Sequence, residues 1–344
     1  MSKILLYTDV HLSTSSSIIR KRGHNYSDRL ENVIKSVTWA ENKAVELGCD
    51  EIICLGDFFD KPILNDEELT ALTEIQWSNL PHTFIVGNHE SSVDGLRFNS
   101  VKSLQGFNFN IVSEVTVRSN DNVDLVFIPY ILEENRKPLR DYLKKEKYNI
   151  IFSHNDIKGI RYGKIESPHG FELSEIEDCC KLFLNGHLHN GTFLNKNKTI
   201  LNLGNLTGQN FGEDAFNYSH CALVVDTETF ELTFIENPHA YNFYKIDIEK
   251  ASDISRVKSK LKNNAVVSFR CLDSLEPTLR DYLVNESLIN TYKINVYSDD
   301  NREDTTLDSE LMNSVDHLKQ FRDFILEQLG SSKVVQEEVY EVCK

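Results

Sequence analysis

The sequence predicts a mixed α/β fold, in which a central sheet or sandwich is covered by helices and followed by a smaller second domain. Three observations predict it. The first half alternates short apolar segments with stretches of helical periodicity, and the segment that follows is rich in strands. Near Pro238 the pattern changes to strands separated by two helical stretches. The length, 344 residues, is also more than one hydrophobic core usually serves.

Local signals place the elements in order. Residues 3–8 form an apolar strand, and Ser27 with Asp28 can cap a helix whose apolar positions recur at helical spacing until Gly48 ends it. The elements expected next are a strand at 51–55, a helix from Asn65 or Asp66 to Trp77, strands at 83–86, 123–128, 149–153, 182–184 and 199–203, and a hairpin of 221–225 with 231–235.

Three domains are expected, at residues 1–237, 238–300 and 301–344. The second is predicted as a small α/β domain with strands at 243–248, 265–271 and 292–297 and helices at 254–261 and 277–284. The third is acidic, and its apolar residues between Leu311 and Leu329 recur at helical spacing. Such a helix can pack on its own protein or dock on a partner, and the spacing leaves both open.

Composition excludes several classes of protein. With 37 basic and 53 acidic residues the net charge is −16, which argues against broad, charge-driven binding to nucleic acid or anionic membranes but leaves room for a local metal site. Seven cysteines without a Cys-x-x-Cys pair indicate buried, reduced thiols. No apolar stretch approaches the roughly 20 residues of a membrane span. We therefore expect a cytoplasmic protein without membrane association.

The residues that carry chemistry follow the ends of the predicted strands. They are Asp9-Val10-His11, Gly56-Asp57-Phe58-Phe59-Asp60, Gly87-Asn88-His89-Glu90, Ser153-His154-Asn155 and Gly186-His187-Leu188-His189. Alternate residues of an extended segment face the same side, so Asp9 with His11, and His187 with His189, can each present two ligands together. Carboxylate, imidazole and amide oxygen are ligands of divalent first-row metals, and no thiolate specifies a structural zinc.

These five motifs together resemble the calcineurin-like metallophosphoesterase superfamily, and the resemblance spans residues 3–236. It implies a four-layer β-sandwich flanked by helices, with two divalent metal ions, Mn²⁺ or alternatively Mg²⁺, at one edge. By matching position, one ion would be held by Asp9, His11, Asp57 and His189, and the other by Asp57, Asn88, His154 and His187, so that Asp57 would bridge them.

Two further residues are assigned through the same resemblance. His89 lies beside a ligand without being one, which leaves it free to protonate the leaving oxygen as the catalytic acid; the alternative is a hydrogen bond that only supports the site. Asp60 can orient a ligand histidine. Many nuclease relatives carry histidine at that position, so the role of Asp60 is left open.

Within the superfamily the chain is most similar to the SbcD-type nuclease subunits of bacteria and phages. Four features carry this narrower resemblance: the strand that runs into Asp9-Val10-His11-Leu12, the Gly56–Asp60 motif, the stretch Ser167-Pro168-His169-Gly170 upstream of the Gly186–His189 motif, and the later small α/β cap. The resemblance implies a DNA nuclease, a homodimer acting with an SbcC-type, SMC-like ATPase, whose cap shapes the DNA path and whose C-terminal helix grips the ATPase coiled coil.

Two alternatives to the nuclease hypothesis are a small-substrate phosphoesterase, such as a cyclic-nucleotide phosphodiesterase or a phosphatase, and a scaffold with a vestigial metal site. The cap and the terminal helix argue against the first, and the complete ligand set argues against the second. Residues 20–22 with His24, and residues 161–164, are basic stretches that can contact phosphates or lie as solvated loops.

Overall fold

A computed structural model describes residues 2–14, 26–92, 95–119, 123–145, 147–162, 165–213 and 215–298. The terminal helix expected at 311–329 and the basic stretch at 20–22 lie outside these residues, as does part of the stretch at 161–164. Met1–Val296 form one compact unit. None of the described helices is long and apolar enough to cross a membrane. The six cysteines within the described ranges are free thiols; five are buried, as expected, and Cys221 is half-buried.

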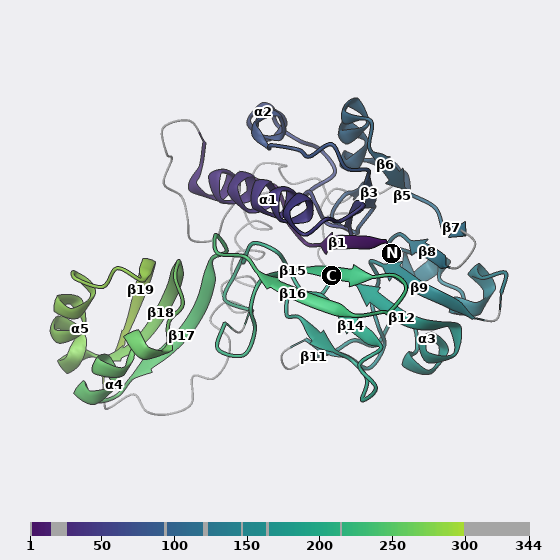
Figure 1. Ribbon diagram of the computed structural model, residues 1–344. Coiled ribbons are helices and arrows are strands. Elements are labelled where there is room, and N and C mark those ends of the chain that lie inside the picture. The colour runs from purple at the N-terminus through teal and green to yellow at the C-terminus, as the bar shows by residue number, and fades with distance from the viewer. Residues whose placement is uncertain are drawn as a thin grey trace, which may run out of the picture. The chain divides into compact units, whose positions relative to one another are not determined.

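Two six-stranded sheets form the centre of the molecule (Figure 1). The first has the order β16-β15-β1-β2-β3-β6, and the second has the order β13-β14-β12-β9-β8-β7. The strands of the first sheet are β1 (Lys3–Tyr7), β2 (Glu51–Cys54), β3 (His82–Ile85), β6 (Asn110–Val112), β15 (Cys221–Asp226) and β16 (Leu232–Glu236). Those of the second are β7 (Thr116–Ser119), β8 (Asp124–Ile128), β9 (Tyr148–Ser153), β12 (Cys180–Asn185), β13 (Thr192–Phe193) and β14 (Ile200–Asn202).

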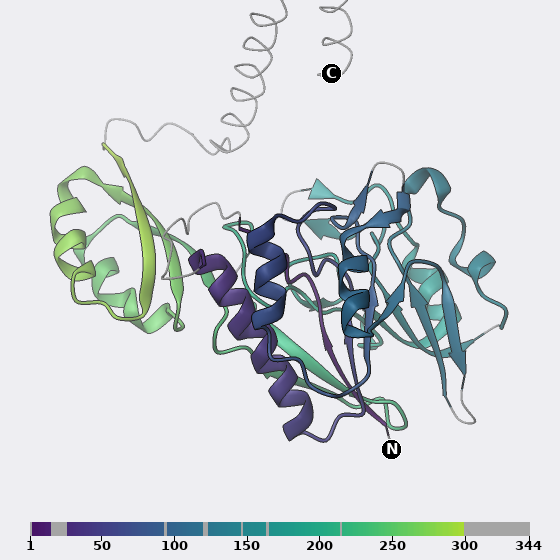
Figure 2. The ribbon, with the colours of Figure 1, turned by 90° about the horizontal axis from the view of Figure 1, so that it is seen from above.

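Apolar residues on both faces of each sheet produce four layers. One core fills the space between the sheets, where Leu6 and Ile53 of the first meet Phe152 and Leu184 of the second. The outer face of the first sheet is covered by helices α1 (Asp28–Glu46) and α2 (Asp66–Glu74), which lie side by side (Figure 2). Helix α3 (Leu173–Cys179) covers the outer face of the second sheet. The predicted four-layer sandwich is confirmed.

Helix α1 begins and ends close to the predicted positions because its signals are local. The Ser27 hydroxyl accepts from the amide of Leu30, which caps the first turn. Helix α2 begins with a capping box between Asn65 and Glu68, but it ends at Glu74 and not at Trp77 as expected. The indole of Trp77 turns back and donates to the carbonyl of Leu72 at 3.2 Å, which satisfies a free carbonyl of the last turn.

The short elements without a strong apolar pattern were not predicted. They include helix α3, the edge strands β6, β7 and β13, the short strands β4 (Ser91–Ser92), β5 (Gly95–Asn99), β10 (Arg161–Tyr162) and β11 (Ile165–Glu166), and the 3₁₀ helices η1 (Ser100–Phe107), η2 (Glu133–Asn135) and η3 (Leu139–Tyr142). Strand β7 is exposed along its length, so it shows no apolar alternation in the sequence.

A small sheet follows the sandwich in sequence. Its order is β17 (Asn242–Ile248), β18 (Ala265–Leu272) and β19 (Ile289–Tyr297), with helices α4 (Ala251–Arg256) and α5 (Glu276–Leu283) and the 3₁₀ helices η4 (Lys258–Lys260) and η5 (Asp273–Leu275). The helix expected at 254–261 is wrong in its bounds. Asp253 accepts from the amide of Lys250 and so starts α4 earlier, and the chain continues after Val257 as η4.

Candidate metal centre

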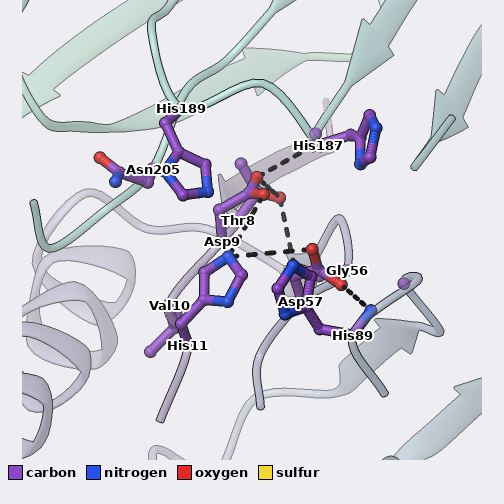
Figure 3. Close-up of polar contacts among 12 residues, drawn as sticks. Thr8, Asp9, Val10, His11, Gly56, Asp57, His89, His187, His189 and Asn205 are labelled. Atoms are coloured by element: carbon purple, nitrogen blue, oxygen red, sulfur yellow. Dashed lines mark hydrogen bonds and ion pairs between the residues drawn. The ribbon is translucent and has the colours of Figure 1, made fainter. Parts of the chain in front are cut away.

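The predicted site residues converge at one edge of the sandwich. Strands β1, β2 and β3 run parallel, so Asp9, Asp57 and Asn88 follow them at the same edge of the first sheet. Strands β9 and β12 are also parallel, and they bring His154 and His187 to the facing edge of the second sheet. Figure 3 shows side chains from both sheets pointing toward one another. The pairing of strands thus assembles residues that are far apart in sequence.

The backbone at this edge is held in an unusual conformation. The amide of Asp9 donates to the carbonyl of Gly56 and the amide of His11 to that of Asp57, both at 3.0 Å, so the loops after β1 and β2 are joined beyond the strand ends. Asp9, His11, Asp57 and His187 all have positive φ, between 48° and 80°. Such conformations cost about 1–3 kcal/mol each and persist where the surrounding structure imposes them, as at functional sites.

Two glycines make the close packing possible. Gly56 has a φ of 112°, and a side chain there would also collide with the ring of His154. A Cβ on Gly87 would collide with the carboxylate of Asp57. Neither position can accept a larger residue without displacing a predicted metal ligand.

Asp9, His11 and His189 form the first cluster, which we call the Asp9 group. One potential ligand atom from each lies within 4.8 Å of the others. Asp9 Oδ2 accepts from the hydroxyl of Thr8 at 2.7 Å and from the amide of His187 at 3.0 Å. Asp9 Oδ1 and His11 Nε2, which are 3.8 Å apart, are buried and have no hydrogen-bond partner among the described residues. Two buried polar atoms without a partner fit a site for a cation.

The second cluster, which we call the Asp57 group, contains Asp57, Asn88, His154 and His187. Asp57 Oδ2 is 3.1 Å from His154 Nε2 and 3.8 Å from His11 Nε2, so this carboxylate lies between the two groups. Asn88 Oδ1 is 3.2 Å from His154 Nε2 and 2.9 Å from His187 Nδ1. The structure therefore brings all seven predicted ligands to one edge of the sandwich, while their role as ligands and their division between two ions stay predictions.

Three of the histidines are oriented through their second ring nitrogen. His11 Nδ1 is 3.0 Å from Asp60 Oδ1, His154 Nδ1 is 2.8 Å from the carbonyl of Leu55, and His187 Nε2 is 3.0 Å from Asp156 Oδ1. A metal-bound histidine usually donates its other N–H to such a group, which fixes the ring and its tautomer. The three groups that orient these rings are not predicted ligands, so they support the ligand assignment independently.

Carboxylates and imidazoles shift one another's pKa in opposite directions. Burial alone would lower the pKa of His11 and His154, but Asp60 and Asp9 raise that of His11 to about 10, and Asp57 raises that of His154 to about 9. Burial would raise the pKa of Asp9 and Asp57, yet the imidazoles hold both below their ordinary value. A cation that binds here displaces protons from these rings, so its affinity increases with pH.

His89 lies at the solvent side of the cluster. Its side chain is 42% exposed, and its Nδ1 is 3.1 Å from the carbonyl of Asp60 and 3.5 Å from the Asp60 carboxylate. The hydrogen bond to Asp60 raises the pKa of His89, which favours the protonated ring that a general acid needs. One potential ligand atom of His89 also lies within 4.8 Å of those of His11 and Asp57. Asp60 thus contacts both His11 and His89, a placement that the sequence left open.

Glu90 has a structural role that sequence reasoning missed. Its buried carboxylate accepts from the amides of Phe58, Phe59 and Gly87, at 2.7, 3.1 and 2.7 Å, and so ties the loop after β2 to the loop after β3. Burial, followed by the charge of Asp57, raises the pKa of Glu90 to about 7. The only signal in the sequence was its place at the end of the Gly87–Glu90 motif.

The chain belongs to the calcineurin-like phosphoesterase family, whose sequence profile matches residues 2–210. No curated protein matches the chain. A crystal structure of a protein from Thermus thermophilus is 11% identical, with a TM-score of 0.39 over 68% of this chain and 98% of that one. A crystal structure of a dimetal phosphatase from Danio rerio is 14% identical, with a TM-score of 0.41 over 69% of this chain and 99% of that one.

Family membership defines the class of reaction. The protein is a metal-dependent phosphoesterase, and metallophosphoesterases use two divalent metal ions. When bound, such a pair activates water and offsets charge on the phosphoryl oxygens. The chain itself contributes buried oxygens and ring nitrogens held close together. Beside them lies the partly exposed His89, whose raised pKa favours the protonated ring.

Proposed function

We propose that the chain is a manganese-dependent DNA nuclease subunit that hydrolyses phosphodiester bonds in DNA end processing, recombination, repair or replication. It acts in the cytoplasm as a homodimer with an SMC-like ATPase of the SbcC type. Asp9, His11, Asp57 and His189 hold one metal ion; Asp57, Asn88, His154 and His187 hold the other. His89 protonates the leaving oxygen, and Asp60 orients His11 and His89.

The observation that supports this proposal most directly is the small sheet β17-β18-β19, which the hydrolytic site does not require. No predicted ligand comes from it, yet it has its own apolar core, built on residues such as Ile248, Val267 and Phe269. A phosphoesterase for small substrates has no evident use for this addition. A nuclease needs a further surface to guide a long substrate past the metal centre.

Access to the site is compatible with a polymeric substrate. The side chains of His89 and His189 are 42% and 26% exposed, whereas those of Asp9 and His154 are fully buried. Solvent therefore reaches the cluster at His89 and His189. The net charge of −16 disfavours strong DNA binding by the chain alone, and this is the reason to propose a partner that supplies affinity.

A nuclease assay tests the proposal. Linear and circular duplex DNA are incubated with the protein, with and without Mn²⁺, beside the small diester bis(p-nitrophenyl) phosphate. We expect Mn²⁺-dependent cleavage of both the diester and DNA. A cyclic nucleotide is tested in the same way, and the DNA reactions are repeated with an SMC-like ATPase. If the diester or the cyclic nucleotide is cleaved while both forms of DNA stay intact with the ATPase present, the proposal is contradicted and the small-substrate alternative is favoured.

A further inference from the structure

The buried carboxylate of Glu213 lies against the Asp9 group, although no motif marks this residue. The side chain is 1% exposed. Glu213 Oε1 is 3.3 Å from His189 Nδ1, and it accepts from Asn205 Nδ2 at 2.7 Å and from the amide of Gln209 at 3.0 Å. A buried carboxylate requires such partners, because taking its charge out of water is costly. Its charge is therefore directed at a predicted metal ligand.

A second histidine, His220, also lies near Glu213 but does not compete for it. His220 Nδ1 is 3.0 Å from the carbonyl of Asn205, which accepts the single ring proton of the neutral imidazole. The Nε2 of His220 is 3.6 Å from Glu213 Oε2 and has no hydrogen-bond partner in the described part of the chain. His189 is thus the imidazole that Glu213 can bind through an N–H.

The orientation of His189 follows from this contact. With the Nδ1 proton directed at Glu213, the lone pair is on Nε2. Figure 3 shows a ring nitrogen of His189 that points toward Asp9 and His11, and the His11 and His189 ring centroids are 5.1 Å apart. The other tautomer would place a proton where a cation has to bind.

Glu213 is carried by a segment that contacts both the sandwich and the small sheet, the strap (residues 208–213 and 215–218). At the sandwich end, Arg29 donates to the carbonyls of Gly208 and Val10, both at 2.9 Å, which joins the strap to the motif that contains Asp9 and His11. Toward the small sheet, the Phe211 ring packs on Phe243 with centroids 5.2 Å apart. The segment that leads to Glu213 is therefore fixed by a hydrogen bond to Arg29 and by packing on the small sheet.

We propose that Glu213 is a positioning residue of the metal centre: it fixes the tautomer and ring orientation of His189, and the strap holds it in place. The proposal depends on His189 as a metal ligand and not on DNA as the substrate. It extends the pairs His11–Asp60 and His187–Asp156 to the remaining histidine of the Asp9 group.

The test is a calorimetric titration of the metal-free full chain with Mn²⁺, which uses no nucleic acid and so is independent of the proposed nuclease activity. Glu213→Gln should weaken one of the two Mn²⁺ binding events by about 10–100-fold, the usual effect of losing such a partner, and leave the other unchanged. Nitrogen-15 NMR of the imidazoles should show His189 protonated at Nδ1 in the unaltered metal-free protein and a mixture of tautomers in the variant.

Glu41→Gln is the matched control. Glu41 is buried and lies 2.9 Å from His82 Nε2, so it forms the same kind of pair, away from the predicted ligands. This variant should titrate like the unaltered protein. Glu213→Asp keeps the negative charge but shortens the side chain by one methylene, which moves the carboxylate away from His189. It should therefore also weaken one of the two Mn²⁺ binding events. The proposal is overturned if Glu213→Gln or Glu213→Asp binds both ions with unaltered affinity, or if Glu41→Gln weakens binding equally.

Discussion

The metal edge of the sandwich and the small sheet β17-β18-β19 are built in different ways. The metal edge buries carboxylates and imidazoles, and it holds four of its residues at positive φ. The small sheet buries a conventional apolar core that includes Ile248 and Phe269. Strain and buried charge are thus concentrated where the chemistry takes place, and the rest of the chain provides the packing that sustains them. Substitutions at the edge should alter chemistry, whereas those at the sheet should reach the metal centre only through the strap.

Asp57→Asn should have the largest effect. The amide removes the negative charge from the carboxylate that lies near histidines of both groups, 3.1 Å from His154 and 3.8 Å from His11. We expect hydrolysis of bis(p-nitrophenyl) phosphate to fall below detection and Mn²⁺ stoichiometry to decrease. Full turnover with a single Mn²⁺ bound to the unaltered protein would contradict the bridging role.

His89→Asn should rank second and separate chemistry from metal binding. We expect both Mn²⁺ ions to bind with unaltered affinity, while turnover falls by about 10²–10⁴-fold, the usual contribution of a positioned acid. Calorimetry and single-turnover kinetics on the same preparation measure the two quantities. If the variant loses an ion, His89 is a ligand, which its proximity to His11 and Asp57 also allows.

A comparison of Asp60→Asn with Asp156→Asn should sharpen the roles of the two supporting carboxylates. Both variants should bind Mn²⁺ about 10–100-fold more weakly, because each of the two carboxylates orients a predicted ligand. Of these two carboxylates, Asp60 is the one that also raises the pKa of His89. Without it, His89 loses its proton at lower pH, so the decline in activity at high pH should begin earlier in the Asp60 variant. Identical pH profiles for the two variants would show that Asp60 does not act on His89.

Phe211→Ala should have the smallest effect on the metal centre and tests whether the small sheet reaches it. Removing the ring loosens the strap where it packs on Phe243, which should lower the Mn²⁺ affinity. The decrease should be smaller than in Glu213→Gln, because the Glu213 carboxylate is still present. Phe234→Ala, at a 46% exposed ring on β16, is the control and should bind Mn²⁺ normally. Equal affinity in both variants would mean that the sheet does not support the strap.

Much of this architecture could be predicted because its signals are local. Ser27 and Asn65 cap helices through residues three positions away, and the apolar runs of β1, β2 and β9 identify buried strands. The motifs that follow the strand ends could also be found, and the resemblance to the metallophosphoesterases then assigned seven of their residues as ligands. Family membership rests on the same stretch of sequence.

The remaining features depend on contacts between distant residues, which no local pattern encodes. The end of α2 depends on where the Trp77 indole packs, and the role of Asp60 depends on the loops that bring it between His11 and His89. Glu213 carries no motif, and only the path of the strap places it against His189. Sequence alone thus determined most of the strands and the motifs of the site, because strand and motif signals are short-range, and the family resemblance of those motifs supplied the layers and the candidate ligands. Tertiary structure decided which buried carboxylates support those ligands, because burial and hydrogen bonding are properties of the packed chain.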